Sequence, residues 1–502
     1  MLNMIYDIYK IKIDNFKVFI LLSFFWISIN TGSKYFILDY NDNFNISNLT
    51  NLIRSLLPYL AIVYFIINRD KYFKNFFLNF DLVFLFFLIY GLSQFSGLIY
   101  SLKNFHEHYW IVCLFAIIFF FKNKVDEKDS SSVKLIFFIN KFYILILFSF
   151  FIFYTFKENI LSENLLYHSQ AFHYEFSGNP FPRASGLSRM CLILIIFFNS
   201  IYLSQKLSKR YNFYILIMSS FLVFVLFTLQ SRGAIIFFIF LFMLINILFK
   251  FKNFKKRILY FLFIIIIPIL LTLSYPYFKI SLIEKKEEVG QLSESQRKQN
   301  TDIKIFRDDI ITEIKKNKNF KLSDKIAAIS SNRVNAWKYL LDVFFYGKLS
   351  DTTKENLLSR NFSSESNPVI NKKNFLTGYG PQADRHLMHN RSNPNLSPII
   401  MGPFGAHASN VFIYSLICSG ILGLISIIII NLLIVYKILI IFKNRKKISL
   451  QSDFILNSSM LITLFLQFRG LIENSYGVFG VDLILLISSY TVIVNAYKKI
   501  SE

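Results

Sequence analysis

The sequence predicts an all-α polytopic membrane protein with about 12 transmembrane helices and one large external loop between helices 9 and 10. Hydrophobic residues make up 54% of the 502-residue chain, which includes 60 Phe. They form continuous runs of roughly 16–22 residues, the length that a helix needs to cross a hydrocarbon core of about 30 Å. A transmembrane barrel would instead show short strands of alternating hydrophobicity, so the runs predict helices.

The predicted spans follow one another along the chain. They lie at about 16–30, 52–67, 80–99, 108–121, 135–156, 187–204, 212–230, 233–249, 258–275, 410–436, 453–468 and 477–495. No small-residue cleavage site follows the first span, so we interpret it as retained and not as a signal peptide. We expect one integrated membrane domain, in which residues 1–275 hold helices 1–9, 276–409 form the loop and 410–502 hold helices 10–12.

The net charge of +24 is mainly a topology signal. If both termini face the cytoplasm, the inward loops hold 24 Lys and Arg against 7 Asp and Glu, whereas the short outward loops hold 6 against 7. An excess of basic residues on the inner side sets the orientation of helical membrane proteins. The sequence therefore predicts cytoplasmic N- and C-termini and a large loop on the outer side, and it excludes nucleic acid as the reason for the charge.

The large loop holds two predicted helices, at Thr301–Lys318 and Ser330–Phe345. Ser330 or Ser331 is a suitable N-cap for the second helix. Its predicted apolar face consists of Val334, Trp337, Leu341, Phe344 and Phe345. Arg333 lies one helical turn before Trp337, on the same side. Further along, Gly378-Tyr379-Gly380 predicts a turn, and His407 stands just before the tenth span.

Arginines gather at the predicted outer surface, and this is the pattern that points to chemistry. They are Arg54, Arg183, Arg189, Arg232, Arg333, Arg385, Arg391 and Arg469. The guanidinium group suits bidentate recognition of phosphate and stays protonated beside lipid. Arg232 is the most constrained by sequence, because a hairpin of two spans with almost no loop holds it. These residues predict a surface cavity that binds a lipid-linked diphosphate.

Other classes of site find little support. The chain has no Gly-rich nucleotide-binding loop. His386 and His389 lack a third ligand at a suitable spacing, and the three cysteines lie inside apolar segments, so we expect no metal site and no disulfide framework. Asp482 lies in the outer half of the last span, where a carboxylate needs a partner, and an outer arginine is the natural one.

Several motifs in this order resemble the O-antigen ligase and O-antigen polymerase superfamily. They are Ser231-Arg232-Gly233, Arg333-x-x-x-Trp337, Gly378-x-Gly380 and the run from His407 through Asn410 and Gly420 to Gly423. The resemblance covers about residues 180–490. It departs from the family at one point, because many members have Asn directly after the histidine, whereas Ala408 and Ser409 intervene here. His389-Asn390 has the adjacent form but lies farther from the span, so we prefer His407.

The resemblance implies inverting glycosyl transfer, without metal or cofactor, on the outer side of the bacterial inner membrane. The donor would be an undecaprenyl-diphosphate-linked glycan. Arg232 and Arg333 would bind the diphosphate, with Arg183 and Arg189 as secondary headgroup ligands. His407 would orient or deprotonate the acceptor hydroxyl.

The sequence leaves the acceptor open. A ligase would transfer the glycan to lipid A–core, and a polymerase would transfer it to another lipid-linked repeat unit. The competing class is a polysaccharide flippase or other transporter, since many carriers have twelve spans. Carriers usually show internal repeats and broken helices with polar residues at mid-depth. These spans are nearly free of charge there, which favours the transferase.

Overall fold

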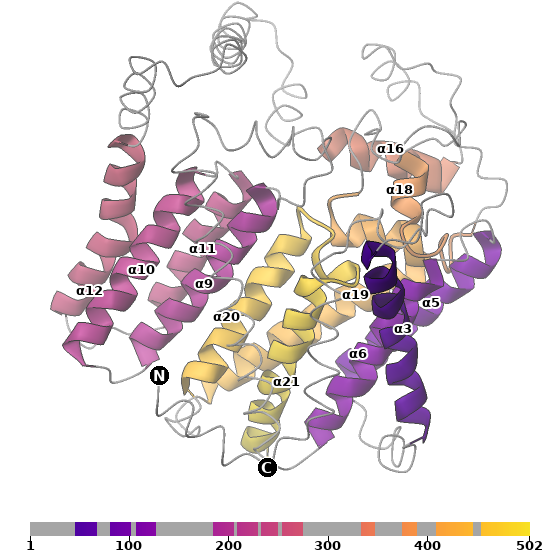
Figure 1. Cartoon of the computed structure of the whole chain (residues 1–502), viewed down its shortest axis with the longest axis horizontal. Coiled ribbons are helices and arrows are strands. Elements are labelled where there is room, and N and C mark those ends of the chain that lie inside the picture. The colour runs from indigo at the N-terminus through magenta and orange to yellow at the C-terminus, as the bar shows by residue number, and fades with distance from the viewer. Residues whose placement is uncertain are drawn as a thin grey trace, which may run out of the picture. The chain divides into compact units, whose positions relative to one another are not determined.

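The structure is a computed structural model, and every regular element that it describes is a helix, which confirms the predicted all-α class. The described residues are 46–67, 81–101, 107–126, 184–204, 208–228, 232–248, 254–274, 333–346, 374–388, 408–444 and 453–501. The elements are α3 (Ile46–Ile67), α5 (Leu82–Ser101), α6 (His108–Asp126), α9 (Ala184–Ser204), α10 (Lys209–Thr228), α11 (Arg232–Leu248), α12 (Phe254–Phe261), the π-helical turn η4 (Leu262–Ile266), α16 (Arg333–Tyr346), α18 (Ala383–Met388), α19 (Val411–Lys443), α20 (Asp453–Gly470), the 3-10 turn η7 (Ser475–Gly477) and α21 (Val481–Ser501) (Figure 1).

Four of these helices are long and apolar enough to cross a membrane, over Leu82–Ile99, Arg210–Thr228, Val411–Lys443 and Val481–Ile500. Shorter apolar helices lie at Leu56–Ile67, His108–Lys122, Ser188–Tyr202, Gly233–Ile245 and Ile258–Ser274. The helices indicate a multi-pass membrane protein. Of the twelve predicted segments, those at 16–30 and 135–156 lie outside the described residues and the other ten overlap helices. The complete twelve-span topology and its orientation stay predictions.

The chain divides into two compact units. One unit is Phe142–Ile326 and contains α9 to η4. Within it α10 packs against α9 and η4, and α11 packs against α9. The ring of Tyr260 is stacked with Tyr202 of α9, at 5.8 Å between centroids, and with Phe242 of α11, at 6.1 Å. Aromatic stacking between helices therefore accounts for part of the high aromatic content.

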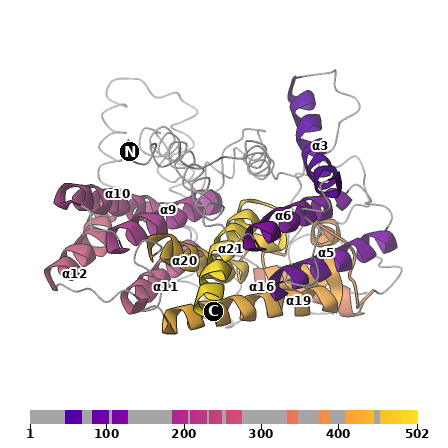
Figure 2. The same cartoon turned by 90° about the horizontal axis from the view of Figure 1, so that it is seen from below.

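The other unit combines Met1–Lys141 with Ala327–Glu502. In this unit α19 packs along α5, α21 packs against α20 and α6, and α3 packs against α6. Figure 2 shows α5 and α19 side by side. The second of the two boundaries falls between residues 326 and 327, within the stretch predicted as the external loop, so α16 belongs to the same unit as α19.

A backbone break in α19 was not predicted from the sequence. Gly420 has φ 65° and ψ −162°, which interrupts the helix. In an unbroken helix the amides of Ile421 and Leu422 would donate to the carbonyls of Ile417 and Cys418. Here those amides donate to the carbonyls of Phe375 and Leu376, at 2.9 and 3.2 Å. The two helix carbonyls accept instead from the amides of Tyr379 and Gly380, at 3.0 and 2.9 Å.

The inserted segment contains the Gly-Tyr-Gly sequence. The amide of Gly378 donates to the carbonyl of Asn374 at 3.1 Å, so the turn lies at Phe375–Thr377, just before the predicted position, while Gly378 and Gly380 have positive φ angles of 69° and 90°. A glycine tolerates positive φ because it has no Cβ. The segment between Phe375 and Gly380 thus supplies the hydrogen bonds that the break in α19 would otherwise leave unmade.

Candidate functional site

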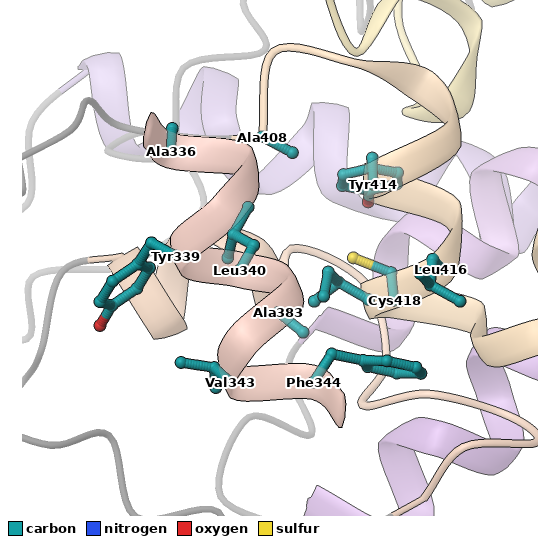
Figure 3. Close-up of a cluster of buried hydrophobic side chains, with 11 residues drawn as sticks. Ala336, Tyr339, Leu340, Val343, Phe344, Ala383, Ala408, Tyr414, Leu416 and Cys418 are labelled. Carbon is teal, nitrogen blue, oxygen red and sulfur yellow. The ribbon is translucent and has the colours of Figure 1, made fainter. Parts of the chain in front are cut away.

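Helix α16 packs on α18 and α19 through one apolar face. Its buried apolar side chains are Ala336, Tyr339, Leu340, Val343 and Phe344, and they contact a cluster that includes Ala383, Ala408 and Cys418 (Figure 3). Of the predicted apolar face, Phe344 is buried, whereas Val334 and Phe345 are exposed. The prediction favoured the most apolar residues and left out Ala336 and Tyr339. Burial raises the pKa of Tyr339 to about 12, so its hydroxyl stays protonated and donates to the carbonyl of Leu387 at 3.1 Å.

Arg333 is the first residue of α16 and forms an ion pair with Glu473. The Nη2 atom of Arg333 lies 3.0 Å from Oε1 of Glu473. The Arg333 side chain is 30% exposed and that of Glu473 is 16% exposed. Glu473 belongs to the short turn between α20 and α21, so the ion pair joins the start of α16 to that turn.

Two hydrogen bonds hold Ala408, the residue that follows His407 in the sequence. The indole Nε1 of Trp337 donates to the carbonyl of Ala408 at 2.6 Å. The amide of Ala408 donates to Oδ2 of Asp384 at 2.8 Å. Ala408 is fully buried, and both of its backbone polar groups are bonded to side chains from elsewhere in the chain. The Arg333-x-x-x-Trp337 motif therefore contacts the turn at Glu473 with one residue and the start of the 408–410 segment with the other.

Asp384 connects this segment to the turn that carries Glu473. Its Oδ2 also accepts from Nδ2 of Asn474 at 3.3 Å, and Oδ1 of Asn474 accepts from the amide of Asn410 at 3.1 Å. Asn410 in turn caps α19, since its Oδ1 accepts from the amides of Phe412 and Ile413 at 2.8 and 3.0 Å. Such a side chain satisfies amides that the first helical turn leaves free. The carboxylate of Asp384 thus connects α18 with the 408–410 segment and with the turn that contains Asn474.

Replacing Asp384 by alanine is expected to lower the free energy of unfolding by about 2–4 kcal/mol, because it removes the acceptor of a buried amide. Asp384 is fully buried, so water would not readily replace the carboxylate. Asp384→Asn is the matched variant, since its carbonyl oxygen can still accept from Ala408, and it should cost less than the alanine. Thermal unfolding of purified protein in detergent tests this order. Equal midpoints for wild type and Asp384→Ala would refute the anchoring role of the carboxylate.

The turn between α20 and α21 is held by a second ion pair. Nε of Arg469 lies 2.9 Å from Oδ2 of Asp482, and the Ser475 hydroxyl donates to the same oxygen at 3.0 Å. The two charged side chains are only 12% and 4% exposed. The expectation that Asp482 pairs with an arginine is confirmed by Arg469, while the outer position of the pair stays a prediction.

The predicted site residues fall in different parts of the structure. Arg333 is described with its side chain, and Arg189 lies half-buried on α9. Arg232 begins α11, and the structure describes its backbone but not its side chain. Arg183 and His407 lie outside the described residues. Arg189 and Arg232 belong to the Phe142–Ile326 unit and Arg333 to the other unit. The convergence of Arg232, Arg333 and His407 stays a prediction.

Sequence reasoning missed Asp384 and Asn474. Neither belongs to a recognisable motif, and each acts through contacts with residues distant in the sequence. For Asn410 a signal existed, because an asparagine directly before a long apolar run is a typical N-cap. The three cysteines are free and buried, as expected. In the part of the chain that the structure describes, no three His, Cys, Asp or Glu side chains come together as metal ligands.

Comparison with known proteins gives one match. Residues 213–346 match the O-antigen ligase family. The matched stretch includes Arg232, Arg333 and Trp337, and it ends before the Gly378–Gly380 turn and His407. It covers less than half of the chain. No curated protein and no solved structure matches.

Proposed function

Because residues 213–346 are a segment of the O-antigen ligase family, we propose that this protein is an inverting, metal-independent glycosyltransferase of surface-polysaccharide biosynthesis. It moves a glycan from an undecaprenyl-diphosphate carrier to an acceptor hydroxyl, as an O-antigen ligase does. The reaction takes place on the periplasmic side of the bacterial inner membrane. The lipid-linked donor and the acceptor both come from the bilayer, which agrees with a chain that carries several apolar helices.

The observation that carries the proposal is the matched segment together with the setting of Arg333. This residue begins a 14-residue helix, and a helix N-terminus favours anions. Through Trp337 the same helix contacts Ala408, the neighbour of the proposed base His407 in the sequence. The segment therefore supplies a phosphate-binding cation on an element that is anchored beside the start of α19.

The proposed step exchanges one carbon–oxygen bond for another and transfers one proton. The acceptor oxygen attacks the anomeric carbon of the donor sugar on the face opposite the diphosphate, and His407 takes the hydroxyl proton. The bond from the anomeric carbon to the diphosphate oxygen breaks, and its electron pair stays on the leaving group. Arg232 and Arg333 stabilise the negative charge that develops there. Arg183 and Arg189 are proposed to contact the remaining charge of the same headgroup.

Two alternatives remain in view. The polymerase alternative uses the same donor and differs only in the acceptor, a second lipid-linked repeat unit. The transporter alternative gains one specific observation, because α19 is broken as helices of carriers often are. The break in α19, however, is filled by the backbone of Phe375–Gly380, which satisfies the amides and carbonyls that a carrier would leave for its ligand. We therefore keep the transferase as the proposal.

A deletion strain tests the function and the acceptor together. Complementation with wild type should restore surface glycan, resolved on a gel, whereas Arg232→Ala and His407→Ala should lose it at normal protein levels. In the deletion strain, bare core with accumulated lipid-linked polymer indicates a ligase, and core that bears one repeat unit indicates a polymerase. If both variants restore full glycan, Arg232 and His407 are not active-site residues, and the transporter becomes the favoured hypothesis.

A further inference from the structure

The Arg333 guanidinium is held by one of its nitrogen atoms. Nη2 donates to Glu473, and the other residues that the structure describes make no hydrogen bond to this group. A guanidinium carries five N–H donors, so most of its donors are not used by Glu473. With 30% of its side chain exposed, Arg333 can be reached by a ligand while it remains paired.

Glu473 is the better fixed member of the pair. Its amide donates to the carbonyl of Arg469 at 2.9 Å, which closes the turn after α20. The next residue, Asn474, is 8% exposed and is bound to Asp384 and to the amide of Asn410. The carboxylate thus stands on a backbone that is tied on both sides, whereas the arginine reaches it through a long stem with about 2 kcal/mol of rotamer entropy.

We propose that Glu473 is a positioning residue for Arg333. It restrains the guanidinium before the donor arrives and leaves the remaining N–H groups for the diphosphate oxygens of the lipid-linked glycan. This inference rests on the proposed function, in which Arg333 binds that diphosphate. Prepared donors stabilise developing charge without reorganising during the reaction, so the orientation matters more for the rate than for the fold.

The carboxylate also offsets the positive charge of Arg333 when no donor is bound. A lone arginine at a surface attracts any small anion, whereas a paired arginine offers less net charge to a single phosphate. A diphosphate that is held at several points can still use the free N–H groups. Glu473 is therefore expected to favour the large lipid-linked donor over inorganic phosphate.

A double-mutant cycle tests whether Glu473 acts through Arg333. Lipid-linked glycan and acceptor are both extracted from the deletion strain, and initial rates of the purified protein are measured at varied concentrations of the lipid-linked glycan. Glu473→Ala should lower kcat/KM for the donor about tenfold, and Glu473→Gln, which keeps an acceptor oxygen, should stay within about threefold of wild type. In an Arg333→Ala background, Glu473→Ala should cause no further loss. Leu471→Ala, an exposed position in the same turn, is the matched control.

The outcomes separate this inference from the proposed function. If Arg333→Ala keeps the full rate, Arg333 does not bind the donor and the proposed site fails. If Arg333→Ala loses activity while Glu473→Ala does not, the positioning role alone fails. Equal fold losses from Glu473→Ala with and without Arg333 would also overturn it, because Glu473 would then act independently of Arg333. Inhibition by added inorganic phosphate should increase in Glu473→Ala, and unchanged inhibition would contradict the selectivity for the donor.

Discussion

Arg333→Ala is expected to lower the initial rate of glycan transfer by about 10²–10³-fold, the usual cost of removing one preorganised group that stabilises a leaving-group charge. Arg333→Lys should retain more activity, because it keeps a positive charge but loses the planar fork that binds phosphate at two points. The initial rate is expected to decrease from wild type to Arg333→Lys to Arg333→Ala. Rates measured on membranes of the deletion strain, with purified variants at equal concentration, give this order directly.

The control for this series is Lys338→Ala. Lys338 is an exposed cation on the same helix as Arg333, so its removal changes the charge of α16 without touching the ion pair with Glu473. We expect it to keep the wild-type rate. Thermal unfolding should show similar midpoints for all variants, because the Arg333–Glu473 pair is partly exposed and such pairs add little to stability. A comparable fall in rate for Lys338→Ala would show that the effect comes from the general charge of the helix.

Gly420→Ala is expected to prevent the accumulation of folded protein. An added Cβ would lie 2.4 Å from the carbonyl oxygen of Leu376 and 2.6 Å from the amide nitrogen of Gly378, and neither backbone atom can rotate away. The φ and ψ angles of Gly420 also fall in a region that only glycine adopts readily. Strain and overlap together cost about 3–6 kcal/mol, a large part of the 5–15 kcal/mol that stabilises a typical domain.

Immunoblots of membranes and the monodisperse fraction in detergent measure this effect. Gly91→Ala is the matched control, because its Cβ would meet the side chains of Phe115 and Leu114, which can move. We expect a much smaller loss there. Wild-type levels of Gly420→Ala would mean that the segment at Phe375–Gly380 can leave α19, and the break would then be a consequence of packing and not a requirement of the fold.

The positions of the helices along the chain were predictable, because a local pattern of apolar residues determines them. The ten apolar segments that overlap helices were visible as runs of suitable length, and the pairing of Asp482 followed from the cost of an isolated carboxylate in a span. The break in α19 was not predictable. A single glycine in an apolar run is usually tolerated within a helix, and only the backbone of a distant segment makes Gly420 a break.

For the candidate site, too, the sequence predicted some residues but not their contacts. Arg333 and Trp337 stood out as residue types at helical spacing, and their contacts with Glu473 and Ala408 lie 140 and 71 residues away in the sequence. No periodic pattern reports such pairings. The buried face of α16 was misjudged for a related reason, because Tyr339 became suitable for burial only through a carbonyl acceptor on α18.

The three-way approach at Gly97, Gly378 and Gly420 constrains the order in which the protein can assemble. A Cβ at Gly97 of α5 would lie 2.6 Å from the amide nitrogen of Gly380, and one at Gly378 would lie 2.5 Å from that of Gly420. At about 5–20 residues per second, the ribosome needs roughly 20–60 s to proceed from α5 to α19. During that time the surface of α5 around Gly97 lacks its native contacts with Gly378 and Gly380. Completion of the unit must therefore follow the synthesis of α19, and a chain truncated before this helix would display α5 to chaperones and to the proteases that clear unassembled membrane segments.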